Sequence, residues 1–87
     1  MLSHTIGGYV AEGTIAIELE TLQNDFRDLD IGSYPFYFGG RPGSNFVLRG
    51  PSKVRIDEAA GQLRGIIIKL GGDPIDGGVE VPVDKSD

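Results

Sequence analysis

Two segments of this 87-residue chain carry apolar residues at helical spacing, and segments with strand-like patterns precede, separate and follow them. In the first segment, Ile15, Leu19, Leu22 and Phe26 recur four, three and four residues apart, which is one face of an α-helix. The second segment repeats this spacing with Ile56, Ala59, Ala60, Leu63, Ile67 and Leu70. A helix that is apolar on one face must cover another layer, so the pattern predicts a two-layer α+β fold.

Three segments before and between these helices read as strands. Thr5–Val10 mixes apolar residues with two glycines, which weaken a strand. Leu29 and Ile31 alternate with polar residues, as in a half-buried strand, and Pro35 marks an edge, a bulge or the end of that strand. The chain then turns through the glycine-rich residues 39–44 and returns along Phe46–Arg49, which predicts a β-hairpin.

The second helix and the end of the chain carry boundary signals. Ser52 is a plausible N-cap, and Gly71 with Gly72 is a stop signal. The alternation of Val79, Val81 and Val83 predicts a last short strand, confined to an edge because Pro82 cannot donate to a ladder. We therefore expect one domain over residues 1–83 and a disordered tail over residues 84–87.

The predicted order of elements is β-α-β-β-α, with a final β. Two amphipathic helices would then cover one face of an antiparallel sheet, in the split β-α-β arrangement of ferredoxin-like domains. No internal repeat or linker divides the chain.

Composition excludes several classes of function. Eight Lys and Arg stand against 13 Asp and Glu, a balance that works against binding a phosphate backbone, so no nucleic acid partner is expected. The chain has no cysteine and a single histidine, His4, which excludes thiolate and paired-histidine metal sites. No apolar run approaches the ~20 residues of a membrane span, and residues 1–6 are not expected to belong to a signal peptide. A cytoplasmic protein without membrane or metal is expected, and His4 is expected to be exposed.

The glycine-rich turn is a candidate anion site. It offers backbone amides and Arg41, with Arg49 on the following strand. The candidate ligand-binding residues are Gly39, Gly40, Arg41, Gly43, Ser44 and Arg49. A phosphate loop of the Walker type needs a lysine and a following helix, and this segment has neither, so a plain hairpin turn is the favoured interpretation.

Aromatic residues on the second strand are a candidate interaction surface. Tyr34, Phe36 and Phe38 share one parity, and Phe46 is assigned to the same group on the neighbouring strand. Sheet aromatics stack bases in RNA-recognition domains, but the acidic charge of the chain disfavours that role. Core packing or docking on another protein is the better interpretation.

Other constellations are weaker. Asp25, Asp28 and Asp30 do not follow the ligand spacing of a calcium loop, and nothing marks Ser3, with His4 and Asp28, as an activated nucleophile. The chain is therefore not expected to be an enzyme. Two glycines of the second helix, Gly61 and Gly65, lie either against a close neighbour or on the surface.

Several short runs resemble a known family. They are Gly13–Ala16, Leu22-Gln23, Asp30–Phe36, Phe46–Gly50 and Leu70–Pro74, of which Ile31–Phe36 is the most specific. Over residues 3–74 the chain resembles the C-terminal portion of stand-alone molybdopterin-binding proteins related to competence/damage-inducible protein A (CinA). The N-terminal part of eukaryotic FAD synthetases resembles the same group. In these proteins a small α+β segment follows a MogA/MoaB-like domain.

The ligand signature of that family belongs to the MogA/MoaB-like domain, and its glycine, proline and hydroxyl pattern is broken at Gly71–Asp76, where Ile75 replaces the Thr or Ser. The resemblance therefore implies no catalytic or ligand residue and no cofactor in this segment, since molybdopterin or a nucleotide would bind the other domain. It implies a non-catalytic accessory domain that docks on the MogA/MoaB-like domain or on a second copy of itself. The alternative is a module that contacts a nucleotide or pterin phosphate through the glycine-rich hairpin.

Overall fold

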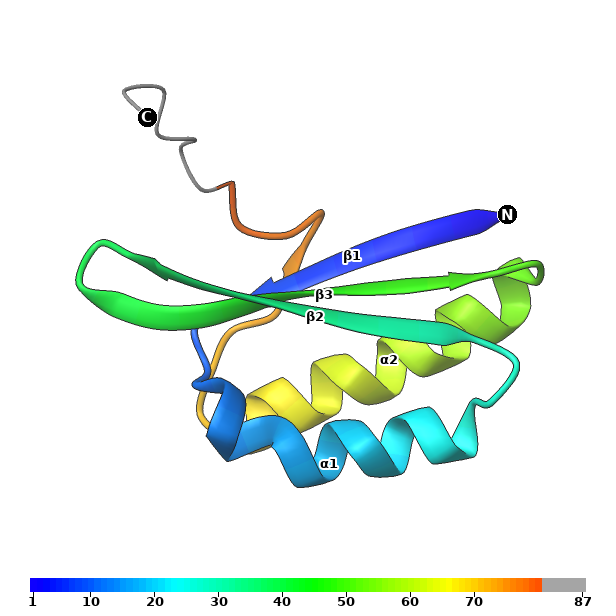
Figure 1. The fold of residues 1–87 in the computed structure, drawn as a ribbon, viewed down its shortest axis with the longest axis horizontal. Helices are drawn as coiled ribbons and strands as arrows, with labels where there is room; N and C mark the ends of the chain where they lie inside the picture. Colours follow the sequence, from blue (N-terminus) through cyan, green and yellow to red (C-terminus); the bar gives the residue numbers. More distant parts are fainter. Residues whose placement is uncertain (81–87) are drawn as a thin grey trace.

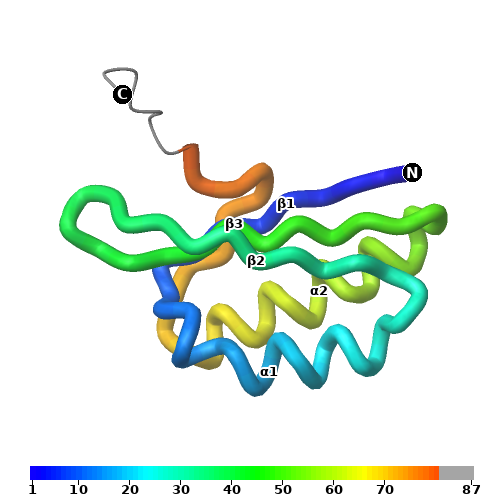
Figure 2. Tube along the Cα trace, in the orientation of Figure 1, coloured from blue at the N-terminus to red at the C-terminus, as the bar shows by residue number. Residues whose placement is uncertain are grey.

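The computed structural model describes residues 1–80. Its elements, in chain order, are β1 (Leu2–Gly8), α1 (Glu12–Asp25), β2 (Asp30–Phe38), β3 (Arg41–Gly50), α2 (Lys53–Lys69) and β4 (Ile75–Asp76). The strands form one antiparallel sheet in the order β2-β3-β1-β4. Both helices cover the same face of this sheet (Figures 1 and 2). This arrangement confirms the predicted ferredoxin-like α+β fold.

The core lies between the sheet and the helices. Its central side chains are Ile6 from β1, Phe46 and Leu48 from β3, and Leu63 and Ile67 from α2, all fully buried. The helical spacing read from the sequence is confirmed, because the residues on both predicted faces are buried or packed against this cluster. They are Ile15, Leu19, Leu22, Phe26, Ile56, Ala59, Ala60, Leu63, Ile67 and Leu70.

The hairpin is longer than predicted. Strand β2 continues through Pro35 to Phe38, and β3 begins at Arg41, so the turn consists of Gly39 and Gly40 alone. Both glycines have positive φ, 64° and 77°, as a two-residue turn of this handedness requires. The predicted turn over residues 39–44 is therefore wrong beyond Gly40, where the chain already pairs as a strand.

Pro35 lies within an edge strand, β2, and an edge is one of the three places that the sequence predicts for it. The N–H of Ile31 donates to Oε1 of Gln23, 3.0 Å away, and therefore points to the outer edge of the sheet. Since the direction alternates along a strand, the nitrogen of Pro35 also points outward, where no ladder bond is lost. Nε2 of Gln23 donates to the carbonyls of Phe26 (3.1 Å) and Leu29 (2.9 Å), so one side chain holds the whole α1–β2 connection.

The last strand is not the predicted one. Strand β4 is Ile75–Asp76, which pairs with β1, and Val79 lies outside it. The backbone of Val79 instead bonds to the side chain of Asn45. The predicted strand residues Val81 and Val83, the domain end at residue 83 and the tail over 84–87 lie outside the described residues.

The second helix begins as predicted. The hydroxyl of Ser52 accepts a hydrogen bond from the N–H of Arg55 at 3.3 Å, and Gly71 has φ of 91° after the helix. A Cβ built on Gly61 or Gly65 meets nothing within 4 Å, so these two glycines lie on the surface. Neither helix within residues 1–80 has the length and apolar character that crossing a membrane requires.

An ion pair joins the α1–β2 connection to the start of α2. Arg55 donates to both carboxylate oxygens of Asp28, at 2.9 and 3.0 Å, and its guanidinium lies 4.4 Å above the centre of the Phe26 ring. This hydrogen-bonded arginine lowers the pKa of the Asp28 carboxyl below its ordinary value of 3.8. The charged form of Asp28 therefore stabilises the fold.

The lowered pKa of Asp28 predicts acid sensitivity. A depressed folded-state pKa gives stability that is complete above the unfolded value of 3.8 and is lost as the pH falls through the folded value. Urea unfolding between about pH 5 and about pH 2 should show a shallower loss of stability for Asp28→Asn than for the wild type. Asp25→Asn, at a carboxylate without an ion pair in residues 1–80, is the control. Equal acid sensitivity of the wild type and Asp28→Asn would contradict the assignment.

Candidate functional site

Three aromatic residues lie on the face of the sheet opposite the helices, which we call the open face. Tyr34, Phe36 and Phe38 of β2 are paired with Asn45, Gly43 and Arg41 of β3, and residues paired in this way share a face. We call Tyr34, Phe36 and Phe38 the aromatic surface. Phe46 does not belong to it, which corrects the sequence assignment: it is paired with Ser33 on the helix side and is fully buried.

Glycines next to two of the rings, Gly43 across from Phe36 and Gly32 on the strand of Tyr34, allow these rings to lie flat on the backbone. A Cβ on Gly43 would come within 2.6 Å of Cζ of Phe36, and a Cβ on Gly32 within 3.1 Å of the Tyr34 ring. The Phe36 ring also packs edge-on against Tyr9, with the ring centres 5.5 Å apart. Packing therefore fixes the orientation of Phe36, the middle residue of the aromatic surface.

The outer residues of the aromatic surface are open to solvent. Tyr34 is 52% exposed and Phe38 is 40% exposed. The tip of the β2–β3 hairpin extends past the ends of both helices, so it stands away from the core (Figure 1). Tyr37, at 72% exposure, lies on the other face of the same hairpin, because it is paired with Pro42 on the helix side. Large exposed rings on a projecting hairpin are typical of a protein-docking surface.

The residues proposed for anion binding are not gathered in one place. Gly39 and Gly40 form the exposed turn, and the guanidinium of Arg41 lies 4.3 Å above the centre of the Tyr9 ring. Arg49 is eight residues further along β3, about 26 Å away at the rise of a strand, and it pairs with Asp30 at 3.7 Å. Gly43 and Ser44 are buried. The six residues therefore do not surround a common ligand, and the turn with Arg41 is the part that remains accessible.

The segment after β4 lies across the open face, a placement that no pattern in the sequence predicts. The side-chain amide of Asn45 donates to the carbonyl of Val79 at 2.9 Å and accepts from its N–H at 2.7 Å. The N–H of Gly77 donates to the carbonyl of Thr5 at 2.8 Å. The segment lies so close to β1 that a Cβ on Gly7 would stand 2.7 Å from the nitrogen of Val79. This segment therefore covers the centre of the open face, at Gly7 and Asn45, and leaves the aromatic surface on the hairpin side uncovered.

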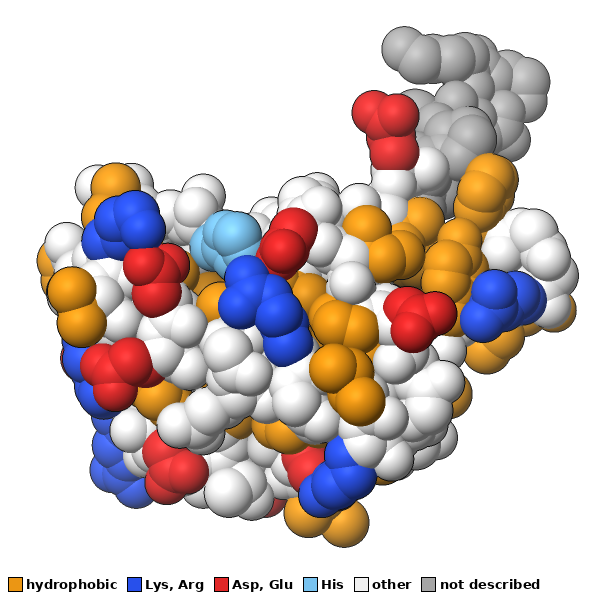
Figure 3. Space-filling model, turned by 180° about the vertical axis from the view of Figure 1, so that it is seen from behind, with side chains coloured by type: hydrophobic (Ala, Val, Ile, Leu, Met, Phe, Trp, Pro, Cys, Tyr) orange, Lys and Arg blue, Asp and Glu red, His pale blue; other side chains and the backbone are white. Residues whose placement is uncertain are grey.

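A polar cluster ties β4 to the helix side. Oδ1 of Asp76 accepts from Nη2 of Arg64 at 2.8 Å and lies 3.3 Å from Nε2 of His4. Arg64, and to a lesser extent His4, lowers the pKa of the Asp76 carboxyl. His4 is therefore half-buried beside this ion pair. The sequence predicts an exposed histidine, and that prediction is wrong. Figure 3 shows His4 in pale blue between basic and acidic side chains.

The alternative catalytic and calcium constellations are not assembled. Ser3 and His4 are neighbours on a strand and point to opposite faces, while Asp28 is engaged by Arg55. Asp30, the third carboxylate of the calcium alternative, pairs with Arg49. Within residues 1–80, no group of three His, Cys, Asp or Glu is placed to hold a metal ion. The chemistry that the aromatic surface offers is apolar contact beside one exposed arginine, Arg41.

The packing of Phe36 predicts a cost for filling the space above Gly43. In Gly43→Ala the new methyl group would lie 2.8 Å from the carbonyl oxygen of Gly8 as well as against Phe36, so the ring must leave Tyr9. We expect the free energy of unfolding in urea to fall by about 1–3 kcal/mol. We also expect the Phe36–Tyr9 contact to disappear from NMR spectra. The control Gly61→Ala, on an open helix surface, should keep or raise stability by up to about 1 kcal/mol. If Gly43→Ala had the same free energy of unfolding as the wild type, this packing would be contradicted.

Comparison with protein families gives one match over most of the chain. The family described as FAD synthase, middle domain, matches residues 1–69. Comparison with curated proteins gives no match. This match confirms the relation to FAD synthases that the sequence resemblance includes. The matching part is the middle domain and not the N-terminal part. The relation to CinA stays a prediction. The chain, with its two-layer fold and aromatic hairpin, belongs to the family of the FAD synthase middle domain.

Proposed function

We propose that this chain is a non-catalytic accessory domain that docks on a neighbouring MogA/MoaB-like domain through its aromatic surface. The exposure of Tyr34 and Phe38 on a hairpin that projects beyond the helices carries the proposal. Water contact at two large rings is unfavourable, and a partner that covers them gains free energy in proportion to the apolar area buried.

The family description supports this role. A middle domain has neighbours within a FAD synthase, and a surface that binds a neighbour is what such a position calls for. The neighbour that we name, a MogA/MoaB-like domain of the molybdopterin-binding group related to CinA, comes from the resemblance over residues 3–74. The open face also explains the direction of docking, because the helices occupy the other side of the sheet.

An NMR titration of the chain with an isolated MogA/MoaB-like domain tests the proposal. Backbone amide shifts should concentrate at residues 34–38 and on the facing part of β3. Tyr34→Ser should weaken binding by about tenfold or more, because one of the two exposed rings of the aromatic surface is lost. Tyr37→Ser is the matched control, since Tyr37 is even more exposed than Tyr34 but lies on the opposite face of the same hairpin. Its affinity should stay within about threefold of the wild type.

Two outcomes would remove this proposal. One is the absence of any amide shift on adding the MogA/MoaB-like domain. The other is an equal loss of affinity for Tyr34→Ser and Tyr37→Ser, which would show that the open face is not what binds. Shifts at residues 34–38 that depend on the concentration of the chain alone would replace the domain by a second copy as the partner.

A second candidate function is contact with a phosphate of a nucleotide or pterin through the hairpin tip. Its supporting observation is that Gly39 and Gly40 lie in open space beside the exposed Arg41. In a protein that carries this chain with a nucleotide- or pterin-binding domain, Arg41→Ala should then lower ligand affinity by about tenfold, because a charge-assisted hydrogen bond is lost. Arg49→Ala, at the far end of β3, is the control. Unchanged affinity of Arg41→Ala in calorimetric titration would exclude this function.

A further inference from the structure

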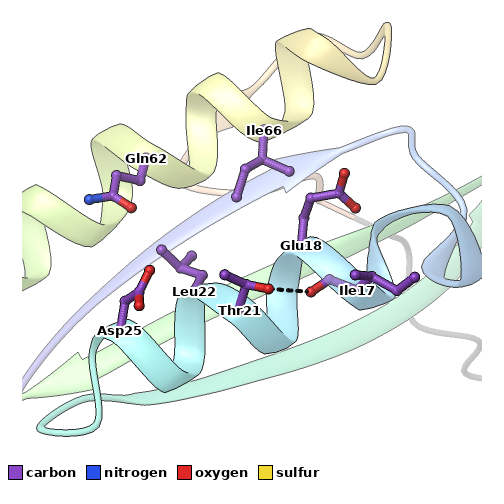
Figure 4. Close-up of a pocket in the computed structure, with 7 residues that line it drawn as sticks. All are labelled: Ile17, Glu18, Thr21, Leu22, Asp25, Gln62 and Ile66. Carbon is purple, nitrogen blue, oxygen red and sulfur yellow. Dashed lines mark hydrogen bonds between the residues drawn. The ribbon is translucent and has the colours of Figure 1, made fainter.

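The outer side of the helix layer holds a groove that the docking of the aromatic surface does not use. It lies between α1 and α2, on the opposite side of the core from the open face, and has a volume of about 280 Å³. Figure 4 shows two residues of α2 across from five residues of α1. The lining residues are Ile17, Glu18, Thr21, Leu22, Asp25, Gln62 and Ile66.

The groove combines an apolar floor with acidic walls. Leu22 and Ile66 lie at its base, and Ile17 on its α1 side is 78% exposed. Two carboxylates line it, Glu18 and Asp25, and no lysine or arginine does. The charge of Glu18 is shared with Lys69, 3.4 Å away, whereas Asp25 makes no ion pair among the described residues. The hydroxyl of Thr21 donates its proton to the carbonyl of Ile17, so towards a partner it can act only as an acceptor.

The length of α1 sets the length of helix that the groove can hold. α1 supplies most of the lining, has 14 residues and is about 21 Å long, which is the length of a partner helix of about 14 residues. Gly61 and Gly65 lie on the solvent-facing side of α2, outside the groove, and add no side-chain bulk near it.

The charge of α1 selects the kind of helix. Its four charged residues, Glu12, Glu18, Glu20 and Asp25, are all acidic. A basic partner helix would place lysines or arginines against these carboxylates and aliphatic side chains over Leu22 and Ile66. An acidic or uncharged helix would leave Asp25 next to apolar surface without a counter-charge.

We propose that the groove between α1 and α2 binds a basic amphipathic helix of a partner protein. Ile17 and Ile66 contact its apolar face, and Asp25 pairs with its basic edge. The site is independent of the aromatic surface, because the sheet and the core separate the two (Figure 2).

The probe for this site is a synthetic amphipathic helix of about 14 residues made of Leu and Lys, titrated into the 87-residue chain and followed by NMR. Backbone amides of Ile17, Leu22, Gln62 and Ile66 should shift, and binding should weaken as salt is raised. The variant Asp25→Lys should bind at least about tenfold more weakly, because an attraction becomes a repulsion. Asp25 is exposed at the end of α1, so this variant should keep the wild-type circular dichroism spectrum.

Glu20→Lys is the matched control, since it makes the same change in net charge on the same helix at an exposed position outside the groove. Its affinity should stay within about threefold of the wild type. Tyr34→Ser should bind the peptide like the wild type, which separates this site from the docking surface. The proposal is overturned if Glu20→Lys loses as much affinity as Asp25→Lys, if a peptide of Leu and Glu binds equally well, or if the amide shifts lie away from the groove.

Discussion

The open face depends on two places where side chains and backbone approach a strand more closely than a Cβ permits. At Gly7 an added Cβ would stand 2.5 Å from Oδ1 of Asn45 and 2.7 Å from the nitrogen of Val79. At Gly43 it would stand 2.6 Å from the Phe36 ring. Glycine at these positions lets the segment after β4 cover the centre of the sheet and lets Phe36 lie flat beside it. The free aromatic surface is what this close packing leaves uncovered on the hairpin side.

The sequence predicts the helix layer better than the sheet. Helical spacing depends on residues of one segment, and the two predicted faces, with Ile15 and Leu63 as examples, are the ones that the structure buries. Which face a strand residue occupies depends on register with a neighbour, and a difference of one residue reverses it. The pattern of each strand alone therefore places Phe46 and Tyr34 in one group, although pairing places them on opposite faces.

The end of the chain shows a second limit of local patterns. The alternation of Val79, Val81 and Val83 is typical of a strand, yet the residues that pair with β1 are Ile75 and Asp76. Long-range contacts favour this choice: Arg64 binds Asp76, and Asn45 takes both backbone groups of Val79. Neither partner can be identified from the segment itself. The aromatic residues of the candidate surface could be predicted from parity within β2, but the segment that borders them could not.

The two-layer architecture gives the domain two separate faces with different chemistry. On the sheet side, exposed rings stand beside Arg41, so the docking that we propose there depends mainly on burial of apolar area. On the helix side, Asp25 and Glu18 border a groove, so the binding that we propose there depends on charge as well. Because the core lies between these faces, a partner on one does not obstruct the other. A small domain with this arrangement has room for the two partners that we propose, one on each face.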